Sequence, residues 1–102
     1  MRIIALKRIR EYMAAHARAR VSLEEWVAKT QSANWKNLGE LRATFPKADV
    51  VKVASGREVV VFNIGGNAFR MIGAVHFRTG IVFVLRFMTH AEYSKDARKD
   101  TL

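Results

Sequence analysis

Residues 62–72 read FNIGGNAFRMI, and this stretch decides how the second half of the chain folds. Two adjacent glycines separate two segments that are rich in apolar residues. Glycine readily adopts the positive φ that both central positions of a two-residue hairpin turn require. A phosphate-binding glycine loop needs a following helix and a GxGxxG or GK[ST] pattern, and neither accompanies these glycines. We therefore expect Gly65-Gly66 to be a turn between antiparallel strands.

Strand periodicity extends on both sides of this turn. Alternating apolar residues predict strands at about 49–54, 57–64, 67–77 and 81–88. The predicted turns between them are Ser55-Gly56, Gly65-Gly66 and Arg78-Thr79-Gly80. Such short connections join neighbouring antiparallel strands, so the second half is predicted to be a four-stranded meander.

The first half of the chain has the periodicity of helices. A short strand is predicted at residues 2–5, and a helix follows from Leu6 to about Ala17 with its apolar residues on one face. Ser22 and Glu25 have the spacing of a capping box, which predicts that a second helix begins there. The sequence thus places one strand and two helices before the meander.

Two further segments complete the predicted fold. Residues 34–48 are expected to form an irregular connection, in which Pro46 ends any helix. Thr89 and Glu92 have capping-box spacing and predict a short C-terminal helix. The expected architecture is α+β: an N-terminal strand and two helices packed on a mainly antiparallel sheet of four to five strands, in a single domain spanning residues 1–102.

The composition indicates a polyanionic partner. Eighteen Lys and Arg residues against nine Asp and Glu residues give a net charge of +9 and a pI of about 10.7. Nucleic acid is the leading candidate partner, and a basic surface that only maintains solubility is the alternative. The chain has no cysteine, which excludes disulfides, thiolate metal sites and a cysteine nucleophile. Its apolar runs are shorter than the ~20 residues of a membrane span, so we expect a cytoplasmic protein without membrane association.

The predicted turns also fix which side chains share a face of the sheet. With Gly65-Gly66 as the whole loop, Ile64 pairs with Asn67; with residues 78–80 as the next loop, Phe69 pairs with Thr89. The predicted core face then carries Val60, Phe62, Ile64, Phe69, Met71, Val75, Phe77, Ile81, Phe83, Leu85 and Phe87.

The opposite face is predicted to be cationic. It carries Arg70, His76, Arg86 and His90, and Lys52 is expected on the same side. In this register Arg70 pairs with Met88 and is diagonal to both Arg86 and His90, about 7–8 Å away. Clustered like charges reduce stability, so the cluster is best explained by a bound anion; an ordinary solvated face is the alternative.

These side chains suit metal-independent cleavage of RNA by its own 2′-hydroxyl group. His90 can act as acid or base near neutral pH, and Arg70 and Arg86 can stabilise the charge on the phosphate. Tyr93, one helical turn after His90, can stack on a base or donate a proton. No histidine or carboxylate spacing typical of a metal site occurs, so neither a metal nor another cofactor is expected.

FNIGGNAFRMI, followed by VLRFMTHAEYSK at residues 84–95, closely resembles the HigB family of bacterial toxins, which are of the RelE type. Residues 34–51, NWKNLGELRATFPKADVV, are similar to the middle segment of the same family. The resemblance covers roughly residues 20–95. It implies an mRNA interferase, an endoribonuclease that cleaves translated mRNA, usually on the ribosome. It also implies a HigA-type antitoxin with a helix-turn-helix domain.

Site residues follow from the resemblance by position. Arg70 matches the strand arginine of the motif, His90 and Tyr93 match its histidine and tyrosine, and Arg86 matches the basic residue of the last strand. Lys36 matches a basic position in the middle segment and is expected to contact RNA, as are Lys52 and His76 from the cationic face. The chain departs from the family at Ser94, where an acidic residue is expected after the tyrosine.

Two other functions are compatible with these features. A non-catalytic RNA- or ribosome-binding module would explain the charge and the basic face, but it gives His90 and Tyr93 no task. A degenerate toxin would act only as an operon regulator together with its antitoxin. Cleavage of cellular mRNA separates the toxin from both alternatives.

Overall fold

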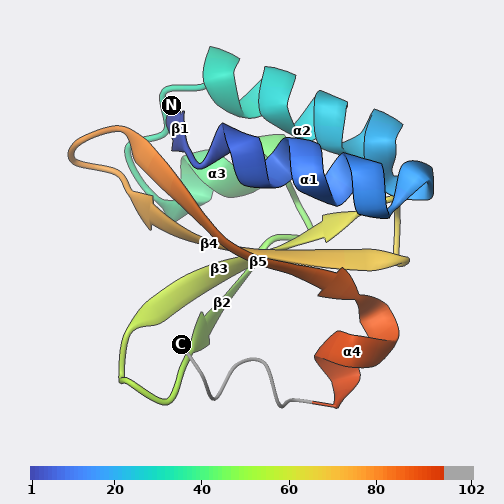
Figure 1. The fold of residues 1–102 in the computed structure, drawn as a ribbon. Helices are drawn as coiled ribbons and strands as arrows, with labels where there is room; N and C mark the ends of the chain where they lie inside the picture. Colours follow the sequence, from blue (N-terminus) through green and yellow to red (C-terminus); the bar gives the residue numbers. More distant parts are fainter. Residues whose placement is uncertain (96–102) are drawn as a thin grey trace.

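The computed structural model describes residues 1–95, which form a curved five-stranded sheet with helices on one face and a short helix beyond its last strand (Figure 1). The elements in chain order are β1 (Arg2–Ile4), α1 (Leu6–Ala15), a short 3-10 helix (Ala17–Ala19), α2 (Arg20–Ser32), α3 (Leu38–Thr44), β2 (Asp49–Lys52), β3 (Glu58–Ile64), β4 (Phe69–His76), β5 (Ile81–Thr89) and α4 (His90–Ser94). This arrangement confirms the predicted α+β class.

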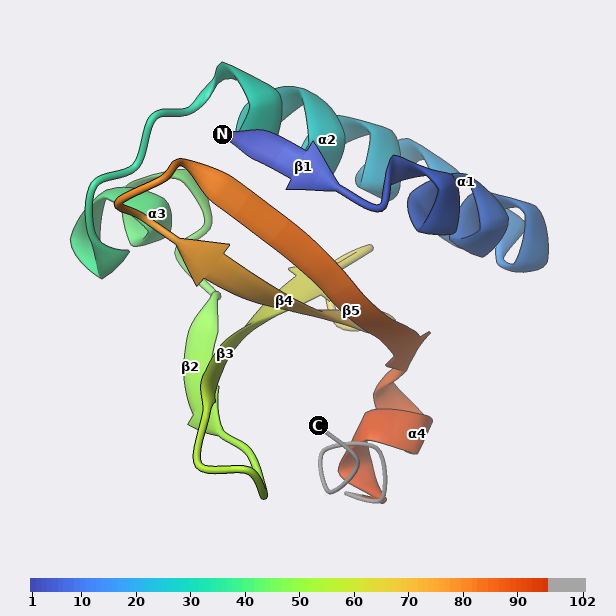
Figure 2. The same ribbon diagram turned by 60° about the vertical axis from the view of Figure 1, so that its left-hand side comes forward.

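The strands lie in the order β1-β5-β4-β3-β2. Strands β2 to β5 form the predicted antiparallel meander, and β1 is parallel to β5. The first strand of the chain therefore lies next to the last one. Figure 2 shows α1 and α2 on one side of the sheet and α4 on the other.

The larger hydrophobic core lies between the sheet and helices α1, α2 and α3. Trp26 of α2 is 2% exposed and packs edge-on against Phe62 of β3, with ring centroids 5.3 Å apart. Phe45, which follows α3, contacts the same Phe62 ring at 5.5 Å. Burial of large aromatic side chains is the main stabilising contribution in such a core. These contacts attach the helices to β3.

A second, smaller cluster lies on the opposite face, which we call the helix-free face because α1, α2 and α3 do not cover it. Its buried members are Val53, Val59, Val61, Ile72 and Met88. Tyr93 of α4 packs against this cluster. Residues alternate between the two faces along β3 and β4, as the period of a strand requires.

Two predictions about the helices were wrong. Helix α2 begins at Arg20 rather than at Ser22, because the 3-10 helix at 17–19 leads directly into it; Ala19 is its N-cap and makes no side-chain cap bond. The connection at 34–48 contains α3. The Asn37 side chain accepts a hydrogen bond of 2.9 Å from the backbone N–H of Glu40, which begins this helix.

The predicted register at the glycine turn was wrong by two residues. Ile64 pairs with Phe69, so the connection comprises the four residues 65–68 rather than Gly65-Gly66 alone. Both glycines do have positive φ, at 65° and 67°. Because side chains alternate with a period of two, a shift of two residues leaves every side chain of β4 on its predicted face.

The register between β4 and β5 changes at a β-bulge. Phe69 pairs with Thr89 and Arg70 with Met88, as predicted, but the register shifts by one residue between Ile72 and Gly73. Between Ile81 and the bulge, each side chain of β5 therefore points to the face of the sheet opposite to the predicted one. The prediction that Ile81, Phe83 and Leu85 face the core was therefore wrong: Val82 and Val84 are buried there, and Phe83 is 36% exposed.

Candidate functional site

Arg70 is the buried cation of the helix-free face, with only 8% of its surface exposed. Its guanidinium group donates to the Asn67 and Phe69 carbonyl oxygens at 3.3 and 3.1 Å, and to the Asn67 side-chain oxygen at 2.5 Å. Three oxygen acceptors thus fix the guanidinium without neutralising its charge. No carboxylate among residues 1–95 forms an ion pair with it. A fixed, uncompensated guanidinium is suited to stabilising an anion.

Helix α4 brings Tyr93 to this arginine. The Arg70 guanidinium lies 6.0 Å from the centroid of the Tyr93 ring, within the range of a cation–π contact. The predicted capping box of α4 is present: Thr89 Oγ1 accepts from the Glu92 backbone N–H at 3.2 Å, and the Glu92 carboxylate accepts from the Thr89 backbone N–H at 3.0 Å. This cap sets the direction in which α4 leaves β5.

His90 is the first residue of α4, and its side chain is exposed. Its backbone N–H donates to the Ala68 carbonyl oxygen at 2.9 Å, which ties α4 to the β3–β4 turn. Arg70 pairs with Met88, two residues before His90, but the β4–β5 ladder ends at Thr89, so the diagonal pairing of His90 with Arg70 stays a prediction. The Ser94 hydroxyl donates to the His90 carbonyl oxygen at 2.9 Å. At this position the serine contacts the helix backbone.

Two asparagines that were not predicted as site residues lie next to Arg70. Asn67 supplies two of the three acceptors of Arg70. Asn63 is paired directly with Arg70 across the β3–β4 ladder and shares its face. Both flank the glycine pair, and the correct register would have revealed that Asn63 lies opposite Arg70. Asparagine side chains offer a donor and an acceptor to a nucleotide near the arginine.

Arg86 lies at the bulge of β5 and is half-buried. Its guanidinium donates to the carbonyl oxygen of the preceding Leu85 at 3.0 Å. It is diagonal to Arg70, because Arg70 pairs with Met88 two residues further along β5. Arg86 therefore belongs to the same end of the sheet as Arg70 and His90.

The three residues predicted to contact RNA lie away from this group. Lys52 pairs with Glu58, whose position in β3 is on the helix-covered face, so the prediction that Lys52 shares the face of Arg70 was wrong. His76 is at the far end of β4 from Arg70 and packs on Phe83 at 5.3 Å. Lys36 precedes Asn37, the N-cap of α3, and α3 lies at the other end of the sheet from α4 (Figure 2).

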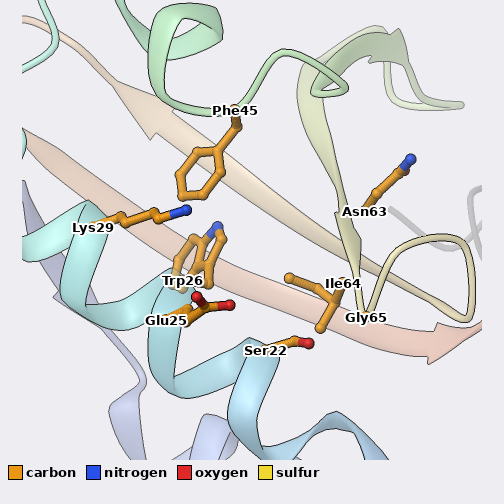
Figure 3. A pocket seen from close by; sticks show the side chains of 8 residues that line it. All are labelled: Ser22, Glu25, Trp26, Lys29, Phe45, Asn63, Ile64 and Gly65. Carbon is orange, nitrogen blue, oxygen red and sulfur yellow. The ribbon is translucent and has the colours of Figure 1, made fainter.

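A cavity of about 150 Å³ lies on the helix-covered side, between α2, Phe45 and the start of the β3–β4 turn (Figure 3). Asn63 also lines the cavity, although Figure 3 shows its side chain directed away from Trp26 and Lys29. The cavity and Arg70 lie on opposite faces of the sheet, and Asn63 belongs to the lining of the cavity as well as to the ladder position opposite Arg70. In residues 1–95, no group of three or more His, Asp or Glu side chains is arranged to hold a metal ion.

Within the same described part of the chain, every helix is too short or too polar to cross a membrane.

A family model described as HigB_toxin, RelE-like toxic component of a toxin-antitoxin system, matches residues 19–96. The chain is 34% identical over 89 residues to the mRNA interferase toxin HigB of Escherichia coli strain K12. The aligned segment covers 87% of this chain and 81% of that protein. The same values apply to the mRNA interferase HigB of Escherichia coli O157:H7 and of Shigella flexneri.

Proposed function

The chain belongs to the HigB family of RelE-like toxins, and we propose that its ribonuclease centre is the group formed by Arg70, Arg86, His90 and Tyr93 on the helix-free face. As a HigB-type toxin it is the toxic component of a toxin-antitoxin system and an mRNA endoribonuclease. The observation that supports this location is the buried guanidinium of Arg70, which has no carboxylate partner in residues 1–95 and lies beside Tyr93 and α4.

The proposed reaction is attack of a ribose 2′-hydroxyl on the adjacent phosphodiester. The 2′-oxygen forms a bond to phosphorus, the bond to the 5′-oxygen breaks, and the products are a 2′,3′-cyclic phosphate and a 5′-hydroxyl. His90 and Tyr93 are the proton-transfer groups, one removing the 2′-hydroxyl proton and the other donating a proton to the leaving oxygen. Arg70 stabilises the negative charge that develops on the phosphorane. These steps need no metal ion.

The fold explains why Arg70 is suited to this role. Its acceptors are backbone carbonyl oxygens and an asparagine, so the guanidinium is held in place before substrate binds. Preorganised charge stabilises a transition state more effectively than charge that must reorient during the reaction. Asn63, opposite Arg70, is proposed to contact the nucleotide beside the scissile phosphate.

The partners are an mRNA substrate and a cognate antitoxin. We propose that cleavage takes place on the ribosome in the cytoplasm and that the antitoxin is of the HigA type, with a helix-turn-helix domain. The net charge of +9 supports binding to a ribonucleoprotein surface. Lys36, Lys52 and His76 lie outside the proposed centre, so any contact they make with RNA would be remote from the scissile bond.

The experiment that tests this function compares His90→Ala with His76→Ala. Both remove an exposed histidine, but His90 begins α4, whereas His76 is at the end of β4 remote from Arg70. Each variant is expressed inducibly in a bacterium, and new 5′ ends are mapped on cellular mRNA. We expect wild type and His76→Ala to cut within translated frames and His90→Ala to lose the cuts. Equal cutting by folded His90→Ala would refute the assignment of the centre, and absence of cuts by wild type would favour a non-catalytic binding module.

A further inference from the structure

Strand β5 has an open edge next to the proposed centre. Strand β1 pairs only with Ile81, Val82 and Phe83, and within residues 1–95 no other strand pairs with the rest of this edge. The bulge at Ile72/Gly73 lies just beyond the end of β1. Because β1 ends opposite Phe83, it offers no ladder partner to the next backbone carbonyl groups of β5. Buried or half-buried carbonyl groups of this kind require another donor.

Arg8 of α1 supplies that donor. Its guanidinium donates to the carbonyl oxygens of Val84 and Leu85, at 3.3 Å each. Arg86 donates to the same Leu85 carbonyl oxygen at 3.0 Å. Two guanidinium groups that are 78 positions apart in the sequence therefore meet at one oxygen atom. Their other N–H groups remain available to a ligand, since each arginine carries five.

Within residues 1–95, no ion pair balances the charges of Arg8 and Arg86. The two ion pairs of residues 1–95 are Arg20–Glu24 and Arg42–Asp49, and neither involves Arg8 or Arg86. Tyr12, one turn after Arg8 on α1, is close enough to both arginines for their charges to oppose the effect of burial on its pKa. The Glu11 carboxylate acts on the same tyrosine in the opposite sense. Two guanidinium groups held together beside one exposed carboxylate favour an anionic ligand.

We infer that Arg8 and Arg86 form a phosphate-binding subsite at the open edge of β5, which holds the RNA backbone next to the scissile phosphate. The subsite rests on the proposed function, because it is defined relative to the centre at Arg70. Arg86 is diagonal to Arg70, at a spacing of ~7–8 Å between side-chain positions. A strand of RNA leaving Arg70 in this direction reaches the pair directly. Arg8 lies outside residues 19–96, so this part of the subsite is not a feature of the matched family segment.

The test measures binding of a single-stranded RNA oligonucleotide that is 2′-O-methylated throughout and therefore cannot be cut by 2′-hydroxyl attack. Arg8→Gln removes the charge but keeps a side-chain N–H₂ donor for the bulge carbonyl groups. Arg8→Lys keeps the charge. Arg10→Gln is the matched control, since Arg10 is an exposed arginine of the same helix that does not contact the bulge. Affinity is measured by fluorescence anisotropy at several salt concentrations.

We expect Arg8→Gln to weaken binding by about 3- to 10-fold at low salt and to reduce the slope of log K against log [salt] by about 0.7, the value for one phosphate contact on a single strand. Arg8→Lys should restore the slope, and Arg10→Gln should leave it close to that of wild type. An unchanged slope for folded Arg8→Gln, or an equal loss for Arg10→Gln, would overturn the subsite. Thermal unfolding of each variant verifies folding.

Failure of the subsite is distinguishable from failure of the proposed function. Cleavage of cellular mRNA by wild type, lost in His90→Ala, establishes the centre whatever the result with Arg8. If the centre is established but Arg8→Gln binds the methylated RNA as wild type does, only the subsite is wrong. If His90→Ala still cleaves, the centre is wrong and the salt slope of Arg8→Gln then reports RNA binding alone.

Discussion

Replacing Asn67 by alanine should loosen Arg70 while leaving its charge in place. The Asn67 side-chain oxygen is one of three acceptors of the guanidinium, at 2.5 Å, and the two backbone acceptors remain in the variant. A hydrogen bond to a charged group contributes about 1.5–3 kcal/mol when it is buried. Asn67 itself is exposed, so water replaces part of the lost interaction. We therefore expect the free energy of unfolding to fall by about 1 kcal/mol.

This change is measurable by urea or thermal unfolding. A loss of about 1 kcal/mol corresponds to a decrease in Tm of roughly 4–8 °C for a domain of this size. The effect on catalysis should be larger, because a displacement of about 1 Å in a catalytic group can lower a rate by up to ~100-fold. We expect the rate of mRNA cleavage to fall by roughly 10-fold at equal concentrations of folded protein.

Asn67→Asp is the informative companion variant. Its carboxylate still accepts the bond from Arg70, so stability should stay within about 0.5 kcal/mol of wild type. The same carboxylate competes with a phosphate for the guanidinium, so cleavage should be lost. If Asn67→Ala unfolds and cleaves as wild type does, Asn67 does not position Arg70. If Asn67→Asp remains fully active, the guanidinium does not bind the phosphate.

Three further predictions concern the elements around the site. Thr89→Ala removes the N-cap of α4, which should cost about 1 kcal/mol, displace His90 and lower the cleavage rate. Gly73→Ala should destabilise the fold by about 1–3 kcal/mol in urea unfolding, because a Cβ atom there would lie 3.2 Å from the Phe83 carbonyl oxygen at the bulge. Burial raises the pKa of Tyr12 above its ordinary value of 10.0. The protonated tyrosine is therefore favoured in the folded state, and its contribution to the free energy of unfolding should be complete below pH 10 and decrease as the pH rises further, which a series of Tm values against pH would measure.

Each of these has a control. Thr89→Ser keeps the capping oxygen and should behave as wild type. Gly39→Ala, in α3, serves beside Gly73→Ala, since the atom nearest its Cβ at 3.2 Å is a side-chain oxygen of Asn37 rather than backbone. Tyr12→Phe should abolish the alkaline loss of stability. An alkaline slope that is the same in Tyr12→Phe and wild type would show that another group causes it.

The sequence predicted the element types well because periodicity and turn residues are local signals. The meander, the capping box at Thr89 and the pairing of Arg70 with Met88 were confirmed. What sequence reasoning missed depends on contacts between segments. The β3–β4 connection was expected to contain two residues and contains four, since the chain does not return to the ladder until Phe69. This difference concealed that Asn63 lies opposite Arg70.

The bulge was the larger obstacle. The alternating pattern from Phe77 to Phe87 does not indicate that one strand contains an extra residue. A shift of one residue exchanges the two faces of a strand. Val82 and Val84 are as apolar as Phe83 and Leu85, so composition cannot decide between the alternatives. Gly73 was the available sign, because a glycine inside a strand often marks a bulge. Arg8 and Arg86 donate to backbone carbonyl groups beside this bulge.

The pairing of β1 with β5 has a consequence for synthesis of the protein. During translation β1 emerges well before its partner β5. The helices therefore cannot close over a complete sheet until β5 is available, and contacts of such long sequence separation form slowly. His90 and Tyr93 emerge after β5. A nascent chain thus carries the complete group of proposed catalytic residues only after α4 has emerged.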